Sequence, residues 1–281
     1  MRIKTDEKIL YIFQEVDIMK KLLALLMAAA MIVLCFAACG GSGNDTDTDT
    51  QNGKKYLIYS DKAFAPFEFL DTETNKYAGV DVDLLAAIAE DQGFTYDIKF
   101  EGFDAAMGAV QSGQADAMIA GMTIRADREE IFDFSEGYFE DGSILVVAAN
   151  NDTIKSEEDL KGKKIACKIG TTSTDYAKSI QEKYGFEITT FEGSPEMYQA
   201  VLNGNADACF EDYSVVGWAI KNDSVALKTI GEIVNPGSYG FAVNKGKNAE
   251  LIEMFNKGLA NLKANGKYEE ILNKYGYSAE K

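Results

Sequence analysis

The chain contains no histidine, and this absence excludes several kinds of active site. Without histidine there is no Ser-His-Asp triad, no Cys-His dyad and no histidine-ligated metal. Positive charge is also scarce, because 28 Lys and Arg stand against 45 Asp and Glu, which gives a net charge of −17. A nucleic-acid-binding protein needs a cationic face to neutralise phosphates. We therefore expect no nucleic acid as a partner, and no metal or other cofactor.

A long uncharged apolar run occurs near the N-terminus. The run from Leu22 to Ala38 directly follows Lys20 and Lys21, a pattern typical of a secretory signal peptide. The alternative is a transmembrane anchor, for which the run is short. Residues 1–18 are too acidic for the start of a signal peptide, so Met19 is the expected true start. We predict that residues 1–38 are a leader and that the protein is exported.

Cys39 is the predicted attachment point to the membrane. The segment Phe36-Ala37-Ala38-Cys39-Gly40 resembles a bacterial lipobox, whose cysteine is lipidated and becomes the mature N-terminus. Phe36 departs from the usual aliphatic residue, and cleavage without lipidation is the alternative. Residues 39–54 are mostly Gly, Ser, Asn, Asp and Thr, which cannot form a core and indicate a flexible tether. The predicted location is the outer face of the cell membrane.

From residue 55 onward, short β-rich runs alternate with helical patterns, which indicates an α/β fold with mostly parallel sheets covered by helices. Cys167 and Cys209 lie in two of the predicted strands, and we expect two buried thiols, with a disulfide as the alternative. The expected strands are 56–60, 94–100, 116–120, 143–149, 164–168, 187–191, 208–210, 226–230 and 240–243. The expected helices are 82–92, 104–112, 173–184, 195–203, with Ser194 as its cap, and 249–265.

One nine-residue pattern, A-V-x-x-G-x-A-D-A, occurs twice. It spans residues 109–117 and again residues 200–208, and each copy reads as the end of a helix, a glycine stop and a short apolar strand. Chance reuse of a common helix–strand junction is the alternative. We prefer two topologically similar lobes, each holding one copy. Ligands of parallel sheets bind at the carboxyl ends of the strands, where Asp61, Thr123 with Arg128, Lys168 to Thr172, and Glu211 with Asp212 follow the predicted strands.

Several motifs in order resemble the polar amino-acid-binding proteins of ABC importers, and among them the glutamine-binding type. The resemblance runs from about residue 55 to the C-terminus. It implies the type II periplasmic-binding-protein fold, in which two lobes are joined by two hinge strands, here near residues 138–142 and 235–239. It divides the chain into a first lobe from 55–138 and 239–281 and a second lobe from 139–238. The motifs are Asp61-Lys62-Ala63-Phe64-Ala65-Pro66-Phe67-Glu68-Phe69, Gly79-Val80-Asp81-Val82-Asp83-Leu84, Ala120-Gly121-Met122-Thr123 with Arg128, Phe132-Asp133-Phe134-Ser135 and Gly170-Thr171-Thr172.

The resemblance implies that Arg128 binds the ligand's α-carboxylate, because a guanidinium matches a carboxylate with two parallel hydrogen bonds. Thr123, Thr171 and Thr172 belong to the same predicted site, the N–H of Thr172 at a helix N-terminus. The alternatives are a solvated helix charge for Arg128 and an ordinary helix cap for Thr172.

Asp212 is the predicted partner of the α-ammonium, assisted by the backbone carbonyl of Gly121, since a buried ammonium needs a full partner. A helix cap is the alternative for Asp212. The family resemblance further implies that Phe64 and Phe103 flank the ligand stem, and core packing is their alternative.

Three charged residues are predicted to select the ligand side chain. Lys168 opposes a cationic side chain and Asp61 an anionic one, so a carboxamide satisfies both and glutamine is favoured. An ion pair between Asp61 and Lys168 is the alternative. Glu211 departs from the residue expected in glutamine binders, which leaves cystine or another polar amino acid open.

The predicted function is therefore amino-acid binding by an exported, monomeric, membrane-anchored lipoprotein that delivers its ligand to ABC permease subunits. It is not predicted to be an enzyme. Two other classes stay open at this point: an exported dehydratase of the same fold, with Glu211 and Asp212 as acid and base, and a ligand sensor for a partner receptor.

Overall fold

The structure is a computed structural model that describes residues 54–278. The predicted leader, Cys39 and the tether up to residue 53 lie outside the described residues. Among the described residues, no helix combines the length and the hydrophobicity needed to cross a membrane.

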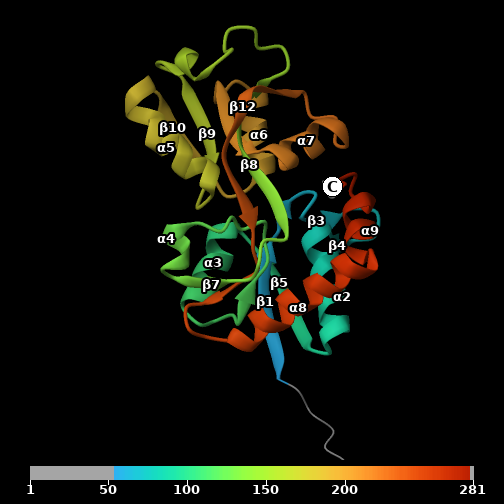
Figure 1. Cartoon of the computed structure of the whole chain (residues 1–281). Helices are drawn as coiled ribbons and strands as arrows, with labels where there is room; N and C mark the ends of the chain where they lie inside the picture. The colour runs from blue at the N-terminus through green and yellow to red at the C-terminus, as the bar shows by residue number, and fades with distance from the viewer. Residues whose placement is uncertain (1–53, 279–281) are drawn as a thin grey trace, which may run out of the picture. The chain divides into compact units, whose positions relative to one another are not determined.

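The first lobe is built on a five-stranded sheet with the order β5-β1-β6-β13-β7 (Figure 1). β1 pairs in parallel with β5 and β6, whereas β13 pairs antiparallel with β6 and β7, so four strands run one way and β13 runs the other. The bounds are β1 Lys55–Asp61, β5 Thr95–Glu101, β6 Ala117–Met118, β7 Phe132–Phe134 and β13 Ala242–Asn244. The helices of this lobe are α2 Val80–Gln92, α3 Phe103–Gln111, α4 Ala126–Glu129, α8 Ala249–Asn265 and α9 Lys267–Lys274.

The second lobe repeats this arrangement with the sheet order β10-β9-β11-β8-β12. β9 pairs in parallel with β10 and β11, and β8 alone runs against its neighbours. Each lobe thus has one reversed strand at the same place in its sheet, so four of the five strands share one direction and each sheet is a mixed parallel and antiparallel sheet, as part of the predicted α/β fold. The bounds are β8 Phe139–Ala148, β9 Lys164–Lys168, β10 Glu187–Phe191, β11 Ala208–Asp212 and β12 Leu227–Tyr239, with helices α5 Thr172–Tyr184, α6 Ser194–Leu202 and α7 Tyr213–Lys221 and the 3-10 turn η1 Glu157–Leu160.

The repeated sequence pattern occupies the same place in both lobes. Asp116 donates its backbone N–H to Leu57 O and accepts the Leu57 N–H through its carboxylate, at 2.8 and 2.9 Å. Asp207 makes the same two bonds with Lys164, at 2.7 and 2.8 Å. Each aspartate therefore fixes the start of its lobe's central strand. The prediction of two topologically similar lobes is confirmed.

Two long strands pass from one lobe to the other. β8 and β12 pair antiparallel from the second sheet down to Phe139 and Tyr239, which lie beside the first lobe. β12 is much longer than the predicted strand at 226–230, because the pairing resumes after irregularities near Val234 and Gly237 instead of ending at Ile230. Asn235, in this irregular region, has a left-handed φ of 48°. The backbone here is paired but distorted, which is what a bending segment requires.

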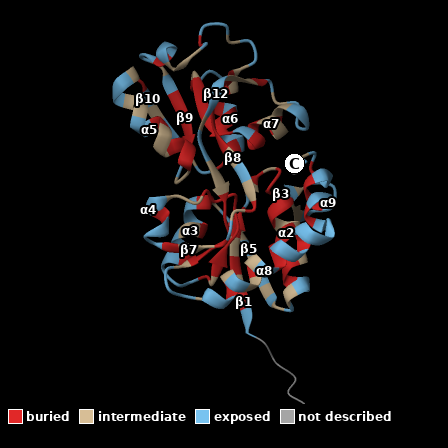
Figure 2. Cartoon of the chain, in the orientation of Figure 1, coloured by how far each residue is buried: buried red, intermediate tan, exposed pale blue. Residues whose placement is uncertain are grey.

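Burial follows the sheets, whose strands are the buried centre of each lobe (Figure 2). In the first lobe, α2 turns Leu84, Leu85 and Ile88 onto the core, as the i, i+3, i+4 spacing predicts. Phe255 of α8 stacks on Phe241, with ring centroids 4.6 Å apart. The small sheet of β2 Ala63–Phe64, β3 Glu68–Asp71 and β4 Lys76–Ala78 was not predicted, and neither was α9, because these elements are too short for a clear period.

Two local predictions are decided by backbone geometry. Cys209 pairs with Ala166 in the ladder, so Cys167 and Cys209 point to opposite faces of the sheet, and the disulfide alternative is wrong. Both thiols are free and buried, as expected. Ser194 is not a helix cap, because α6 already includes it and begins after Gly193.

Candidate functional site

Arg128 places a positive charge inside the protein, at the end of the first sheet. Short helix α4 carries it, and its side chain is only 4% exposed, so the alternative of a solvated helix charge is wrong. Nη1 donates to Thr123 O and Nη2 donates to Gly170 O of the second lobe, both at 2.9 Å. Burial lowers the pKa of Arg128 to about 10, which leaves the guanidinium charged at neutral pH. Its Nε has no partner among the described residues.

Gly121 follows β6 and turns the backbone toward the same place. Its φ is +52°, and a Cβ there would lie 2.5 Å from the ring of Phe64, so the position requires glycine. Its N–H donates to Asp81 Oδ2 at 2.8 Å, and the same oxygen accepts the hydroxyl of Tyr138 at 2.8 Å. Burial raises the pKa of Asp81 to about 6, opposed by these two hydrogen bonds. Asp81 therefore fixes the direction of the Gly121 backbone.

Asp212 supplies a negative charge from the second lobe. Its Oδ1 accepts from Ser173 Oγ at 2.8 Å and its Oδ2 from Tyr239 OH at 2.6 Å. Asp212 stands at the N-cap position of α7 but makes no capping bond; Asp141 accepts the Ser214 N–H instead. The helix-cap alternative for Asp212 is therefore wrong. Burial, followed by repulsion from Asp212, raises the pKa of Asp141.

The N-terminus of α5 faces the same cavity. Thr171 is the N-cap, because its Oγ1 accepts the Thr174 N–H at 3.2 Å, so the cap role considered for Thr172 belongs to its neighbour. Thr172 is the first helical residue, and its N–H is one of those that an α-helix leaves without an internal acceptor. Arg125 of the first lobe reaches Thr172 Oγ1 at 3.3 Å and Asp175 at 2.6 Å.

Lys168 and Asp61 form an ion pair between the lobes, and each side chain is about 1% exposed. This ion pair is the arrangement given above as the alternative to selection of the ligand side chain. Burial tends to lower the pKa of Lys168, but Asp61 and then Glu211 outweigh it, and the pKa is raised. Glu211 is buried beside them and accepts from Tyr198 OH at 3.1 Å and from the Asp212 N–H at 3.0 Å. Burial, followed by repulsion from Asp212, raises the pKa of Glu211 to about 7.

A small cavity of ≈ 10 Å³ lies among these groups. All predicted ligand-binding residues line it except Asp61 and Glu211, which lie behind Lys168. Phe64 and Phe103 are both buried walls of the cavity; the Phe64 ring lies 4.2 Å from Lys168 Nζ and the Phe103 ring 5.4 Å from the Arg128 guanidinium. The lining residues are Phe64, Phe103, Ala120, Gly121, Thr123, Arg128, Lys168, Thr171, Thr172 and Asp212.

Several residues that support the cavity were given no role at the sequence level. Tyr239 donates to Asp212 and its hydroxyl also contacts Asp141, and Arg125 bridges the lobes at the rim. Glu68 is fully buried with both carboxylate oxygens unpartnered among the described residues, and burial, then Asp81, raises its pKa well above the usual range. Asp81 and Glu68 stand inside the quoted motifs, which was the available signal; Tyr239 and Asp141 stand in the predicted hinge segments, where nothing indicated a role for their side chains.

Two similar lobes, two connecting strands and a charged cavity between the lobes define the type II periplasmic-binding-protein fold. The model of the bacterial extracellular solute-binding proteins, family 3, matches residues 56–278, and the chain belongs to this family.

Similar proteins span nearly the same length. A probable histidine-binding protein of Neisseria gonorrhoeae is 32% identical over 92% of this chain and 96% of its own. The ABC transporter glutamine-binding protein GlnH of Bacillus subtilis is 30% identical over 92% of this chain and 97% of its own. The solved structure of an ancestral arginine-binding protein bound to glutamine is 38% identical, with a TM-score of 0.73, over 79% of this chain and 97% of that one.

Proposed function

We propose that this chain is the extracytoplasmic solute-binding component of an ABC importer and that its ligand is a free polar amino acid. The observation that carries this proposal is a buried cation and a buried anion, Arg128 and Asp212, in the walls of one small cavity. An amino-acid zwitterion presents one carboxylate and one ammonium, and each needs a charged partner when it leaves water. Relatives named for histidine and glutamine support the ligand class but not one member of it.

The ligand's two charged groups have separate partners in this proposal. The α-carboxylate binds the guanidinium of Arg128, with Thr123 and the N–H of Thr172 beside it. The α-ammonium binds Asp212 and the carbonyl of Gly121. Thr171 caps the helix that presents Thr172. Phe64 and Phe103, both buried at the cavity, flank the aliphatic stem.

Glutamine is the proposed ligand. A carboxamide offers an N–H to Asp61 and an oxygen to Lys168, so it inserts into their ion pair without adding a net charge. A cationic side chain meets Lys168 in a site of low dielectric, where repulsion is strong. Glu211 would attract a cation, but its raised pKa leaves it partly protonated at neutral pH, which weakens that attraction.

Binding and motion are coupled in this proposal. Residues 138–142 and 235–239 act as hinges within β8 and β12, and the ligand favours the closed arrangement because it contacts both lobes only there. Export, a lipid at Cys39, a monomeric state and delivery to ABC permease subunits complete the proposal.

A thermal-shift screen of the twenty amino acids plus cystine tests the proposal, because a bound ligand raises the melting temperature by mass action. We expect glutamine to give the largest shift, and the shift to disappear in Asp212→Ala. A shift with another polar amino acid would replace glutamine but keep the class. No shift with any amino acid would contradict amino-acid binding.

We propose that the chain is not an enzyme. The rival class, an exported dehydratase, predicts turnover of prephenate or arogenate by the purified protein, lost in Glu211→Gln. We expect no turnover above background. An uptake assay distinguishes a ligand sensor from an importer component. Deletion of the protein abolishes uptake of its ligand if the chain serves an importer.

A further inference from the structure

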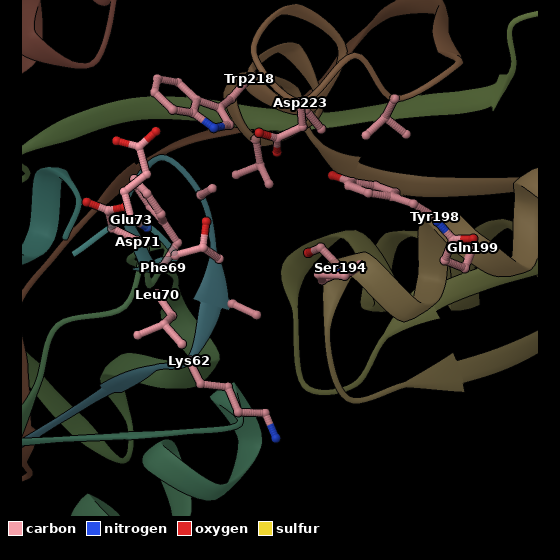
Figure 3. A pocket seen from close by; sticks show the side chains of 17 residues that line it. Lys62, Phe69, Leu70, Asp71, Glu73, Ser194, Tyr198, Gln199, Trp218 and Asp223 are labelled. Atoms are coloured by element: carbon pink, nitrogen blue, oxygen red, sulfur yellow. The ribbon is translucent and has the colours of Figure 1, made fainter. Parts of the chain in front are cut away.

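A second and larger cavity, of ≈ 610 Å³, lies between the lobes (Figure 3). One wall is the first-lobe segment from Lys62 to Glu73, and the other is formed by α6 and α7 of the second lobe. We call it the interlobe groove. No residue lines both this groove and the amino-acid cavity. The two are nevertheless neighbours, because Lys62 follows Asp61 in the chain and Tyr198 of the groove donates to Glu211.

The groove carries negative charge without a matching cation. Asp71, Glu73 and Asp223 line it, and none of them forms an ion pair with another described residue. The hydroxyl of Thr74 and the backbone N–H of Glu73 bond to Asp71 and lower its pKa, so this carboxylate is ionised. The one cation in the walls, Lys62, lies 3.5 Å from Glu192 of the second lobe.

Aromatic surface lies next to these carboxylates. The rings of Phe69 and Trp218 meet across the lobes with centroids 6.0 Å apart, and Leu70 beside them is 44% exposed. Figure 3 shows Trp218 and Asp223 on one side of the groove and Phe69, Asp71 and Glu73 on the other. Carboxylates around aromatic faces attract an ammonium or guanidinium that carries an apolar stem.

An independent observation points to a ligand donor. Ser194, at the start of α6, lines the groove, and its side chain is 3% exposed. Its Oγ meets the geometric criterion for a hydrogen bond with no described residue, although it lies close enough to the Glu211 carboxylate to oppose the rise in the pKa of that group. A buried hydroxyl without a partner is costly. An N–H group of a molecule in the groove would satisfy it, and Figure 3 shows this side chain on the helix that faces the groove.

We propose that the interlobe groove is a second binding site, for a small organic cation such as an alkyl amine or alkyl guanidine. The cation lies between Asp71, Glu73 and Asp223, its stem covers Phe69 and Trp218, and an N–H reaches Ser194. The walls come from both lobes, so an occupant favours the arrangement in which the lobes meet. This part rests on the proposed function: the cation and the amino acid each strengthen binding of the other by the same factor.

Agmatine is the probe, because it carries a guanidinium and an ammonium on an alkyl chain but no carboxylate for Arg128. Trp218 is the one tryptophan of the 281-residue chain, so its emission reports the groove directly. We expect a saturable change in tryptophan fluorescence on addition of agmatine at constant ionic strength. Arg128→Ala should still give a saturable titration, since this residue lies in the other cavity. Absence of a saturable change overturns the proposal.

A pair of double variants separates a built site from general attraction to an acidic protein. Glu73→Gln/Asp223→Asn removes two exposed carboxylates of the groove, and we expect agmatine to bind at least about tenfold more weakly. The matched control, Glu187→Gln/Glu253→Gln, removes the same charge at exposed positions elsewhere. Equal weakening in both double variants would overturn the site. Melting curves of both variants confirm that they are folded.

Coupling is measured by titrating the amino acid at saturating agmatine. We expect a tighter dissociation constant than without agmatine, and an unchanged one would overturn the coupling. If no amino acid binds at all, the proposed function fails, while the agmatine titration still decides the groove.

Discussion

Tyr239 donates its hydroxyl to Asp212 Oδ2 at 2.6 Å, and the same hydroxyl lies 3.1 Å from Asp141 Oδ2. A phenol has one proton, so it cannot satisfy two carboxylates fully. Burial and repulsion from Asp212 raise the pKa of Asp141 to about 7, so Asp141 takes up a proton near neutral pH. The Tyr239 hydroxyl thus links Asp212, the proposed ammonium partner, to the titrating carboxyl of Asp141 in β8.

The first prediction concerns binding and pH. An α-ammonium at Asp212 favours ionised neighbours, so binding should release a proton from Asp141 below about pH 7. Amino-acid affinity should then fall as the pH drops, by at most about tenfold per unit for one proton. Calorimetry in buffers of different ionisation enthalpy measures the released proton. Asp141→Asn should remove the effect, and an undiminished pH dependence in that variant would assign it to another group.

The Asp141 carboxyl also makes the free energy of unfolding depend on pH, in the direction opposite to its effect on amino-acid affinity. Because the folded-state pKa of Asp141 is raised, the unfolded chain loses its proton first as the pH rises from about 4 to about 7. The free energy of unfolding should decrease over this window, by up to about 1.4 kcal/mol per pH unit from this group. Urea titrations at several pH values should show a shallower decrease for Asp141→Asn than for the unmodified protein.

The third prediction tests the charged pair of the amino-acid cavity. Arg128→Ala and Asp212→Ala should each weaken amino-acid binding by about 2–5 kcal/mol, because each leaves one ligand charge unpaired. Arg125→Ala is the matched control, since its ion pair with Asp175 lies at the partly exposed rim and should contribute about 1 kcal/mol or less. Calorimetry decides, and an affinity within about threefold of wild type would remove that residue from the site.

Ligand choice gives the fourth prediction. Glutamine should bind at least about tenfold more tightly than arginine, roughly 1.4 kcal/mol, because the buried Lys168 ammonium opposes a second cation. Lys168→Ala should narrow the gap by improving arginine more than glutamine. Competition binding with both amino acids measures it, and tight arginine binding to the unmodified protein would refute the assignment to glutamine.

The last prediction concerns the membrane. If Cys39 carries a lipid, Cys39→Ala should release the protein from the membrane fraction without detergent. Fractionation followed by immunodetection is the measurement. Retention of the variant on the membrane would place the anchor elsewhere in the chain.

Much of the fold could be predicted from periodic patterns. The strands 164–168 and 187–191 and the helix 249–265 have the expected bounds. The strands are short β-rich runs, and the helix has an apolar i, i+3, i+4 spacing. β12 was predicted too short, since its pairing continues through the irregular backbone around Asn235, where no alternation marks a strand. The first residue of α6 could not be predicted, because a Ser-Pro pair suits two helix starts. Ser194 can be the N-cap with Pro195 as the first helical residue, or Ser194 can itself be the first helical residue.

The residues that line the amino-acid cavity could be predicted where they belong to the recognised motifs. The residues that hold these side chains in place could not. Arg128 lies on α4 and Asp212 at the end of β11, and the fold brings them to one cavity. Asp141 caps α7 from β8, and Tyr239 approaches from the end of β12. These contacts join residues far apart in sequence, so no local pattern indicates them.

The opposite orientation of the two thiols in the second sheet has a practical consequence. Cys209 belongs to the core on one face and Cys167 to the core on the other, each under its own helices. Burial raises the pKa of Cys167 to about 12 and that of Cys209 well above its usual range, so neither is a thiolate in the folded protein at neutral pH. An alkylating reagent reaches each one only when the helices on its face lift away. The alkylation rate of each cysteine thus reports local opening on its own face of the sheet, and the two rates can be measured separately.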